Sequence, residues 1–197
     1  NSVIATMAGL RLADYVVTEA GFGADLGAEK FIDIKCRSAG IRPSAGVLVA
    51  TIRAIKFHGG AAREDLSEEN LPALRAGLAN LNRHINNLRE NYGVPAVVSI
   101  NQFVADTEAE VELVMKHCKA LGVQVALSSH WANGGAGATD LAHMVAEICD
   151  ADTTPANTPH KSFVYPNELS LWEKLEAVAT KVYHASEITA SSKVRDR

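Results

Sequence analysis

Four short apolar runs alternate with helix-like patterns along the chain, and this alternation limits the fold more than any other feature. The runs cover residues 15–18, 46–52, 94–100 and 123–127. Continuous apolar runs of this length are typical of strands that are buried on both faces, as in parallel sheets. Between the runs, apolar residues recur every three or four positions, which indicates amphipathic helices. The sequence therefore predicts an α/β fold in which helices flank one sheet of four adjacent parallel strands.

Polar residues mark the starts of several predicted helices. Asn70 precedes a stripe of leucines and is a suitable helix cap. Thr107 and Glu110 stand three residues apart, as do Ser170 and Glu173, and this is the spacing of a capping box. Further helices are predicted over 3–13, 28–37 and 141–148, and the run 163–165 is a candidate for one more short strand.

The segments that follow the four predicted strands carry glycines and polar side chains. They cover residues 19–25, 53–60, 101–106 and 128–137, and we interpret them as loops. Ligands of parallel sheets bind beyond the carboxyl ends of the strands. We therefore expect these four loops to converge on one edge of the sheet and to form a binding site there.

The first of these loops has the composition of a phosphate-binding turn. Gly21 and Gly23 allow the backbone to approach an anion closely, because glycine has no Cβ. Glu19 and Asp25 lie beside them, and carboxylates do not bind phosphate. They suggest a catalytic Mg²⁺ held between these two carboxylates and a nucleotide. The alternative is a simple turn from strand to helix, with Asp25 as the helix cap.

The second and third loops offer side chains for a nucleotide substrate. Arg53 suits a carboxylate such as formate, or a phosphoryl group in transfer, since guanidinium binds such anions through two nitrogens. A structural pair with a nearby carboxylate is as plausible, and Lys56 and His58 stay open in the same way. Asn101 and Phe103 suit a nucleotide base, through a hydrogen bond and stacking. The alternative for Phe103 is a place in the core.

The fourth loop combines an aromatic side chain with glycines. Trp131 either closes over a base or packs the loop, and Gly134 lies beside it in the sequence. Asp106, at the end of the third loop, is interpreted as a residue of the helix start rather than as a ligand. No Ser/His/Asp or Cys/His constellation for nucleophilic catalysis is evident.

Composition limits the classes of partner. The net charge of the 197 residues is −4 and no basic block is present, which argues against nucleic acid. No apolar run has membrane-spanning length, so we expect no membrane partner. The three cysteines are widely spaced without a metal-binding pattern, which favours reduced thiols in a cytoplasmic protein. Because the chain begins with Asn1 inside a predicted helix, we expect it to be a fragment.

Two sequence blocks carry a resemblance to a known family. The block VTEAGFGADLGAEKF at 17–31, followed by DIKCRSAG at 33–40, resembles the central region of formate–tetrahydrofolate ligase, also called 10-formyltetrahydrofolate synthetase. The block VATIRAIKFHGG at 49–60 matches the signature pattern of that family. The order and spacing of the blocks agree as well, and the similarity extends along the whole chain.

The resemblance implies an activity and a fold. The family joins formate to tetrahydrofolate at the expense of ATP, with Mg²⁺, through a formyl phosphate intermediate. It has a P-loop NTPase type of α/β fold and forms homotetramers. By this resemblance, the segment 19–25 lies near the transferred phosphate, and Asn101 and Phe103 lie near the adenine. Residues 1–151 correspond to the later half of the nucleotide-binding domain, and residues 152–197 to a linker and the start of the next domain.

The main phosphate cradle of such a fold is missing from this sequence. The pattern G-x-x-x-x-G-K-[ST] is absent, and the folate pocket is expected to lie mostly outside the chain. We therefore expect the chain to be inactive alone. Two alternatives stay open: a fragment of another P-loop-related, ATP-dependent carboxylate ligase, and a non-enzymatic binding or assembly module.

Overall fold

The computed structural model describes residues 2–155 and 158–195, and its contacts divide the chain into two compact units. The sheet unit comprises residues 44–89 and 94–153, and the helical unit comprises residues 1–43, 90–93 and 154–197. Each unit is described by itself. The predicted domains, 1–151 and 152–197, are a different division that stays a prediction.

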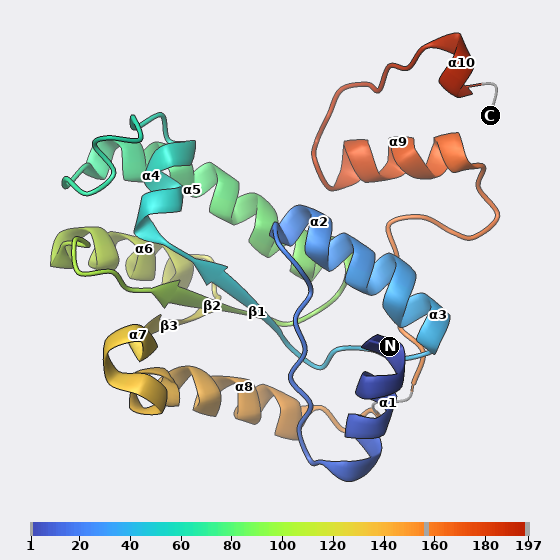
Figure 1. Ribbon diagram of the computed structural model, residues 1–197, viewed down its shortest axis with the longest axis horizontal. Helices are drawn as coiled ribbons and strands as arrows, with labels where there is room; N and C mark the ends of the chain where they lie inside the picture. Colours follow the sequence, from blue (N-terminus) through green and yellow to red (C-terminus); the bar gives the residue numbers. More distant parts are fainter. Residues whose placement is uncertain (1, 156–157, 196–197) are drawn as a thin grey trace. The chain divides into compact units, whose positions relative to one another are not determined.

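The sheet unit contains a parallel sheet of three strands, in the order β1-β2-β3 (Figure 1). The strands are β1 (Gly46–Ala50), β2 (Ala96–Asn101) and β3 (Gln124–Ser128). In the register, Leu48 pairs with Val98, and Val98 pairs with Val125. The central strand β2 is buried on both faces, as its continuous apolar run requires. The predicted α/β fold with a parallel sheet is thus confirmed for these three runs.

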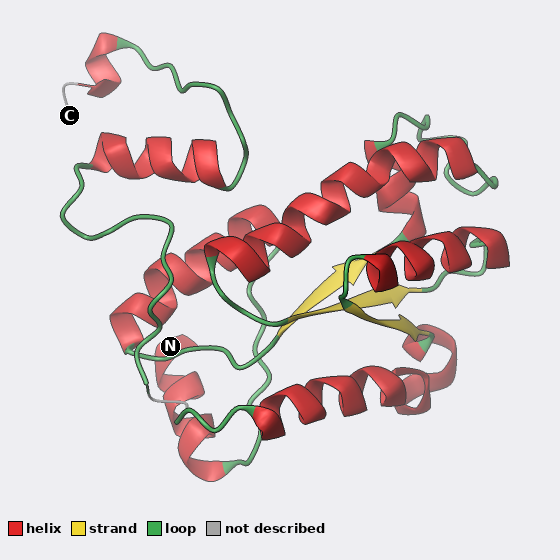
Figure 2. Cartoon of the chain, turned by 180° about the vertical axis from the view of Figure 1, so that it is seen from behind, coloured by secondary structure: helices red, strands yellow, loops and turns green. Residues whose placement is uncertain are grey.

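Helices cover both faces of this sheet. α5 (Leu71–Asn86) and α6 (Glu108–Ala120) lie on one face, and α8 (Thr139–Ala151) lies on the other (Figure 2). The predicted caps are formed: Asn70 accepts a hydrogen bond from Ala73 N at 3.0 Å, and Thr107 and Glu110 form a capping box. The leucine stripe of α5 faces the core. These contacts explain why the 3.6-residue period was a reliable signal.

The predicted loop at 53–60 is wrong, because most of it is a helix. α4 (Ile52–His58) begins at the cap residue Thr51, whose side chain accepts from Ala54 N at 3.1 Å. α4 crosses α5 at two glycines. A Cβ at Gly59 would collide with the carbonyl of Ala73, and a Cβ at Gly77 would collide with the carbonyl of Ile55. Only glycine therefore permits this close approach of the two helices.

The glycine-rich segment after β3 is also helical, although it was predicted as a loop. It forms α7 (His130–Asn133) and a short 3₁₀ helix, η3 (Gly134–Ala138). Ser129 N donates to the carbonyl of Gly137 at 2.9 Å, which closes the segment on itself. Gly137 lies directly against the backbone of Ser129 and His130, where a Cβ would not fit. Glycine is needed at position 137 because two backbone segments approach closely there, and not because the segment is a flexible loop.

The helical unit contains the remaining helices. They are α1 (Ser2–Leu12), α2 (Ala24–Glu29), η1 (Lys30–Cys36), α3 (Arg37–Ala39), α9 (Leu171–Lys181) and α10 (Ser192–Arg195). η1 is a π-helical stretch that joins α2 and α3 into one continuous helix, and a second one, η2 (Asn87–Asn91), follows α5. The capping box of Ser170 and Glu173 is present at the start of α9.

Two predicted strands are wrong. Residues 15–18 are extended but pair with no strand in the described chain, and Val17 is 94% exposed. Val16 instead packs against Gly9 of α1. The preference of β-branched residues for strands depends on a neighbouring strand to pack against, and this run has none in the described chain. The run 163–165 likewise forms no strand, because hydrogen bonds from side chains hold its backbone.

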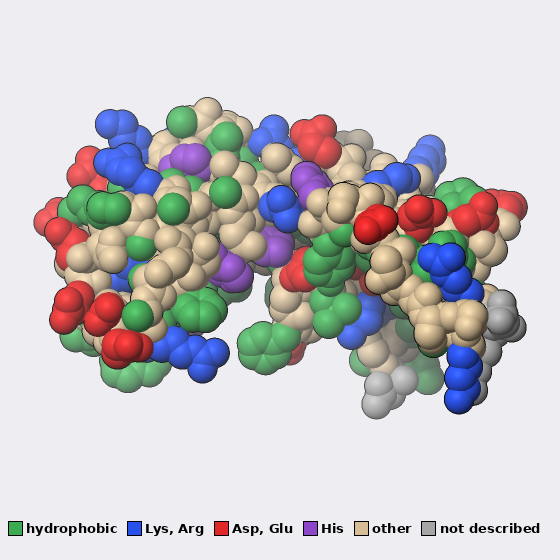
Figure 3. Space-filling view, turned by 90° about the horizontal axis from the view of Figure 1, so that it is seen from above, with side chains coloured by type: hydrophobic (Ala, Val, Ile, Leu, Met, Phe, Trp, Pro, Cys, Tyr) green, Lys and Arg blue, Asp and Glu red, His purple; other side chains and the backbone are tan. Residues whose placement is uncertain are grey.

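The surface mixes charges of both signs. Figure 3 shows Lys and Arg side chains interspersed with Asp and Glu on the face that it draws. Of the helices formed by residues 2–155 and 158–195, none is long and apolar enough to cross a bilayer.

Candidate functional site

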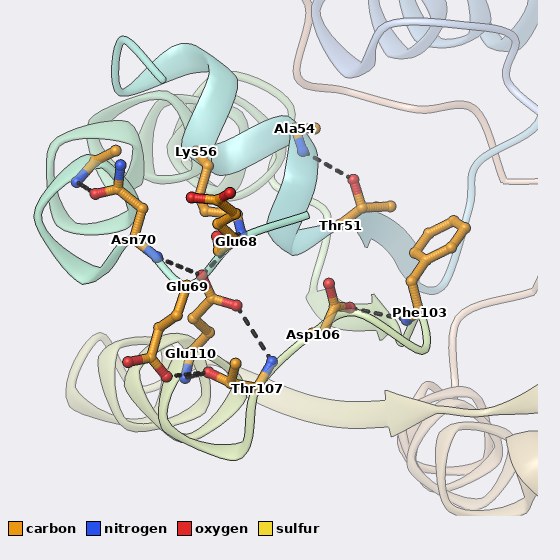
Figure 4. A network of polar contacts seen from close by, with 11 residues as sticks. Thr51, Ala54, Lys56, Glu68, Glu69, Asn70, Phe103, Asp106, Thr107 and Glu110 are labelled. Carbon is orange, nitrogen blue, oxygen red and sulfur yellow. Dashed lines mark hydrogen bonds and ion pairs between the residues drawn. The ribbon is translucent and has the colours of Figure 1, made fainter. Parts of the chain in front are cut away.

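The carboxyl edge of the sheet brings together the segments that follow three strands (Figure 4). Asn101 and Ser128, the last residues of β2 and β3, are register partners, and Gln102 N donates to the carbonyl of Ser128 at 3.0 Å. The hydroxyls of Ser99 and Ser128 lie 2.8 Å apart inside the sheet. The segments after β2 and β3 are therefore fixed to each other at their first residues.

Arg53 lies in the first turn of α4, directly after β1. Its side chain is exposed and makes no hydrogen bond or ion pair with the described residues. The structural ion pair considered as an alternative for Arg53 is thus absent from this part of the chain. His58, at the other end of α4, is also exposed. Arg53 is free to bind an anion from the carboxyl edge.

Lys56 points inward, whereas Arg53 and His58 of the same signature block are exposed. Its ammonium group forms an ion pair with Glu110 Oε1 at 2.8 Å and donates to the carbonyl of Glu68 at 2.7 Å. Glu110 also accepts from the backbone N–H groups of Asn70, at 3.0 Å, and Thr107, at 3.2 Å. Both ionic side chains are fully buried. Lys56 is therefore a structural residue in this arrangement, and it is not exposed to a substrate.

The environment of Glu110 favours its ionised form. Burial raises the pKa of this carboxyl, but the hydrogen bonds from Lys56, Asn70 and Thr107 outweigh burial, and the pKa lies below the usual value. The pair connects α4 with the start of α6, and it also holds the residue that caps α5. Three elements around the carboxyl edge thus depend on one buried ion pair.

The loop between β2 and α6 presents Phe103. The ring is 45% exposed, so Phe103 is not a core residue, which was the alternative. Phe103 N donates to Asp106 Oδ2 at 2.8 Å, and Asp106 N donates to the carbonyl of Phe103 at 3.0 Å. Asn101 lies two residues earlier and is half-buried. An exposed aromatic ring can stack on a base, and an amide side chain can bond to the edge of a base.

Trp131 belongs to α7 and is 80% exposed, so it does not pack the segment after β3. Gly134 has a φ of 56°, in the left-handed region that favours glycine, and it begins the 3₁₀ helix. Asn133 donates from Nδ2 to the hydroxyl of Ser129 at 3.0 Å. The structure therefore holds this segment by its own backbone and leaves the indole exposed.

The glycine loop at 19–25 lies in the helical unit. Gly21 has a φ of 91° and Gly23 a φ of 72°, so both positions favour glycine. Gly23 is the cap residue of α2, and Asp25 makes no capping bond, so the alternative role of Asp25 as the cap is wrong. Burial and the nearby carboxylate of Asp25 raise the pKa of the Tyr183 hydroxyl. The predicted convergence of this loop with the carboxyl edge of the sheet stays a prediction.

The donor atoms of Glu19 and Asp25 fit a magnesium ion in one respect. Carboxylate oxygens are ligands that Mg²⁺ prefers, and Mg²⁺ in nucleotide sites is bound by one or two carboxylates together with phosphates. Glu19 is exposed and Asp25 is half-buried, so both are accessible. No cluster of three or more His, Cys, Asp or Glu that suits a metal occurs in the described part of the chain. Two carboxylates thus fit an ion that arrives with a nucleotide.

Sequence reasoning missed a buried polar cluster in the helical unit. Asp33 Oδ1 accepts from Val164 N at 3.0 Å and from Arg37 at 3.3 Å, and Arg37 also donates to the carbonyl of Tyr165 at 2.7 Å. The guanidinium of Arg37 lies over the ring of Phe163. Burial raises the pKa of Asp33. Asp33 and Arg37 are four residues apart on one helix, but no local pattern reveals that they hold the segment at 163–165.

Comparison with known proteins places the chain in a family. The family model described as formate–tetrahydrofolate ligase matches residues 1–197. The chain is 60% identical over 196 residues to the formate–tetrahydrofolate ligase of Methylococcus capsulatus. This match covers 99% of the chain and 34% of the relative. It is 56% identical over 200 residues to that of Granulibacter bethesdensis, with 100% of the chain and 33% of the relative covered.

A third relative agrees with the first two. The formate–tetrahydrofolate ligase of Pelagibacter ubique is 51% identical over 197 residues, with 100% of the chain and 34% of the relative covered. The chain therefore spans about a third of the length of the curated relatives that it matches. Since the match runs through the glycine loop, α4 and the carboxyl edge of the sheet, the chain belongs to the formate–tetrahydrofolate ligase family.

Proposed function

We propose that this chain is the central part of an enzyme that joins formate to tetrahydrofolate at the expense of ATP and produces 10-formyltetrahydrofolate. One observation carries the proposal: the identity of 51–60% to ligases of this name extends over 99–100% of the chain. The two alternative classes, another ATP-dependent carboxylate ligase and a non-enzymatic module, have no comparable support. We further propose a P-loop NTPase type of fold, a cytoplasmic location and a homotetramer for the whole enzyme.

The nucleotide is proposed to bind at the carboxyl edge of the sheet. Phe103 stacks on the base, and Asn101 bonds to its edge. The support is that the ring is exposed in a loop that hydrogen bonds fix in place. Trp131 and Gly134 contribute a second exposed aromatic surface and a backbone segment after β3. Stacking is a contact that substrate and transition state share, so it contributes mainly to affinity.

The phosphate groups are proposed to bind the glycine loop. Gly21 and Gly23 allow backbone N–H groups to approach phosphate oxygens without a Cβ in the way. Glu19 and Asp25 are the residues that hold Mg²⁺, which, when bound, neutralises charge on the phosphate oxygens during transfer. Arg53, which is exposed and forms no hydrogen bond or ion pair with the described residues, contacts formate or the phosphoryl group during transfer.

The reaction is proposed to pass through formyl phosphate. Formate does not react with an amine directly, so an oxygen of formate first attacks the γ-phosphorus of ATP, and ADP leaves. The folate nitrogen then attacks the formyl carbon and displaces inorganic phosphate, which retains one oxygen of formate. The protein accelerates such a transfer by positioning and by cationic groups rather than by covalent chemistry.

Most of the folate pocket and the P-loop are proposed to come from other regions of the whole enzyme. The chain spans a third of its relatives and contains no G-x-x-x-x-G-K-[ST]. We propose that the chain alone is inactive for this reason.

An isotope experiment tests the proposed function. The full-length enzyme is incubated with ATP, Mg²⁺, tetrahydrofolate and formate labelled with ¹⁸O. We expect 10-formyltetrahydrofolate and inorganic phosphate that carries one labelled oxygen. Formation of the product with unlabelled phosphate would exclude formyl phosphate, and the absence of product would exclude the ligase activity.

A further inference from the structure

The turn from Phe103 to Asp106 is closed by two hydrogen bonds between its end residues. Phe103 N donates to Asp106 Oδ2 at 2.8 Å, and Asp106 N donates to the carbonyl of Phe103 at 3.0 Å. Between them, Val104 is 91% exposed and makes little contact with the protein. Phe103 itself is about half-exposed. Since the turn has little apolar anchoring, its shape depends on these two hydrogen bonds.

Asp106 is not needed to start the following helix. The cap of α6 is Thr107, whose hydroxyl accepts from Glu110 N at 3.3 Å, while Glu110 Oε2 accepts from Thr107 N. This capping box is complete without Asp106. Asp106 directly precedes the cap at the helix start, and its carboxylate bonds to the Phe103 backbone rather than to the helix.

The second oxygen of Asp106 faces α4. Oδ1 is buried and has no hydrogen-bond partner among the described residues, and Figure 4 shows the carboxylate between the Phe103 backbone and α4. The charged groups that act on it are Glu110, which disfavours its negative charge, and Lys56 and Arg53, which favour it. Burial of a carboxylate oxygen without a hydrogen bond is costly.

We propose that Asp106 is a positioning residue of the nucleotide site: its carboxylate fixes the turn that sets the place of the Phe103 ring against the nucleotide base. This inference rests on the proposed function, in which Phe103 stacks on the base. Asp106 does not touch the nucleotide. It acts through Phe103, and the arrangement of the turn beside α4 keeps Phe103 and Arg53 on the same edge of the sheet.

The first test compares substitutions at one position in the full-length enzyme. Asp106→Ala removes the acceptor, whereas Asp106→Asn keeps an oxygen that can accept from Phe103 N. Because a displaced ring loses much of its stacking on the base, we expect Asp106→Ala to raise the Kd for ADP and the KM for ATP by about tenfold. Asp106→Asn should keep both within about threefold of the wild type. The matched control, Glu108→Gln, changes an exposed neighbouring carboxylate and should have no effect.

The second test shows whether Asp106 acts through Phe103. If it does, Asp106→Ala changes the Kd for ADP in the wild type but not in a Phe103→Ala background, where no ring remains to be positioned. A general structural role would instead weaken binding by the same factor in both backgrounds, and this outcome would overturn the proposal. Should Asp106→Ala fail to fold, Asp106→Glu replaces it, because an added methylene displaces the acceptor while the charge is kept.

The outcomes also separate this inference from the proposed function. If the wild-type enzyme binds ATP and forms the product, but Asp106→Ala binds ADP as tightly as the wild type, only the positioning role fails. If Asp106→Ala lowers kcat with an unchanged KM for ATP, the role also fails, since stacking affects binding. If the wild-type enzyme neither binds ATP nor forms product, the proposed function itself fails.

Discussion

The Nζ atom of Lys56 lies 2.8 Å from Glu110 Oε1, with both side chains fully buried, and this pair joins α4 to the start of α6 beneath the carboxyl edge of the sheet. Lys56 belongs to the signature block and looks like a ligand for phosphate in the sequence. In the structure Lys56 is a buried structural residue, while Arg53, three residues earlier, is exposed. Removing one partner of a buried ion pair strongly destabilises a protein, because the other charge stays buried without a counter-charge.

The first prediction concerns this pair. Glu110→Ala leaves the ammonium group of Lys56 buried without a counter-charge, so we expect the free energy of unfolding to fall by about 3–5 kcal/mol. Urea denaturation of the purified protein measures the change. Glu112→Ala, on an exposed face of α6, is the matched control and should change it by less than about 0.5 kcal/mol. A loss below about 1 kcal/mol for Glu110→Ala would show that the pair is not a structural support.

The second prediction is the pH dependence of the same pair. Because the pKa of Glu110 in the folded protein is held below its ordinary value of 4.5, the ionised carboxylate stabilises the fold. This contribution is fully present above the ordinary value and is lost as the pH falls through the lowered value. The difference in unfolding free energy between wild type and Glu110→Gln should therefore be largest near neutral pH and shrink below about pH 4. Denaturation at a series of pH values measures it, and a difference that grows toward acid pH contradicts the sign.

The sequence allowed the fold to be predicted where burial follows a simple period. The runs of β1, β2 and β3 are continuous and apolar, and the stripe of α5 repeats every three or four residues, so both were recognisable. The extended run from Tyr15 to Thr18 has the same composition as a strand, but a strand also needs a partner. Whether a partner strand is present depends on the tertiary structure, and the local sequence does not show it.

The site was predictable only in part for the same reason. Asn101 and Phe103 were proposed as site residues because they stand at the end of a buried strand, and the Phe103 ring is exposed there. Lys56 and Glu110 are far apart in the sequence, so no local spacing indicates that they meet. Helix α4 was missed because the glycines that follow it, Gly59 and Gly60, suggested a loop. Gly59 in fact permits the close contact between α4 and α5.

The third prediction tests that contact. Gly77→Ala places a methyl group against the carbonyl of Ile55, so α4 must move away from α5. We expect a loss of more than about 2 kcal/mol of stability, although alanine is the better helix former. Gly135→Ala is the control, because a Cβ there meets no atom nearby. Thermal denaturation of the two variants measures the difference. Equal stability of Gly77→Ala and the wild type would show that the helices are not in close contact.

The fourth prediction concerns Glu19 in the full-length enzyme. Glu19→Gln keeps the size of the side chain but removes the charge that is proposed to hold Mg²⁺. Since the side chain is exposed, the stability should change by less than about 0.5 kcal/mol. Turnover at saturating ATP should fall by about a hundredfold, because the ion stabilises charge in the transition state. The measurement is kcat over a range of Mg²⁺ concentrations, and Glu168→Gln, another exposed carboxylate of the helical unit, is the control. A normal kcat at all concentrations would leave Glu19 without a catalytic role.

The last prediction is that the 197-residue chain alone does not make 10-formyltetrahydrofolate. The backbone amides and the lysine of a P-loop are absent from the sequence, so the chain offers at most part of the contacts that the phosphates of ATP need. Each lost interaction with the transition state lowers the rate by on the order of a hundredfold. Contacts of so limited an extent barely exceed the entropic cost of association, so ATP should bind with a Kd of about a millimolar or weaker.

Two measurements check this prediction. The purified chain is incubated with formate, ATP, Mg²⁺ and tetrahydrofolate and assayed for the formylated folate, and ATP binding is measured by calorimetry. The full-length enzyme is the positive control in both experiments. Turnover by the chain that persists after repurification, with full-length enzyme excluded by intact mass, would contradict the prediction. It would also show that these residues contain the phosphate site, because formate must be phosphorylated by ATP before an amine can attack it.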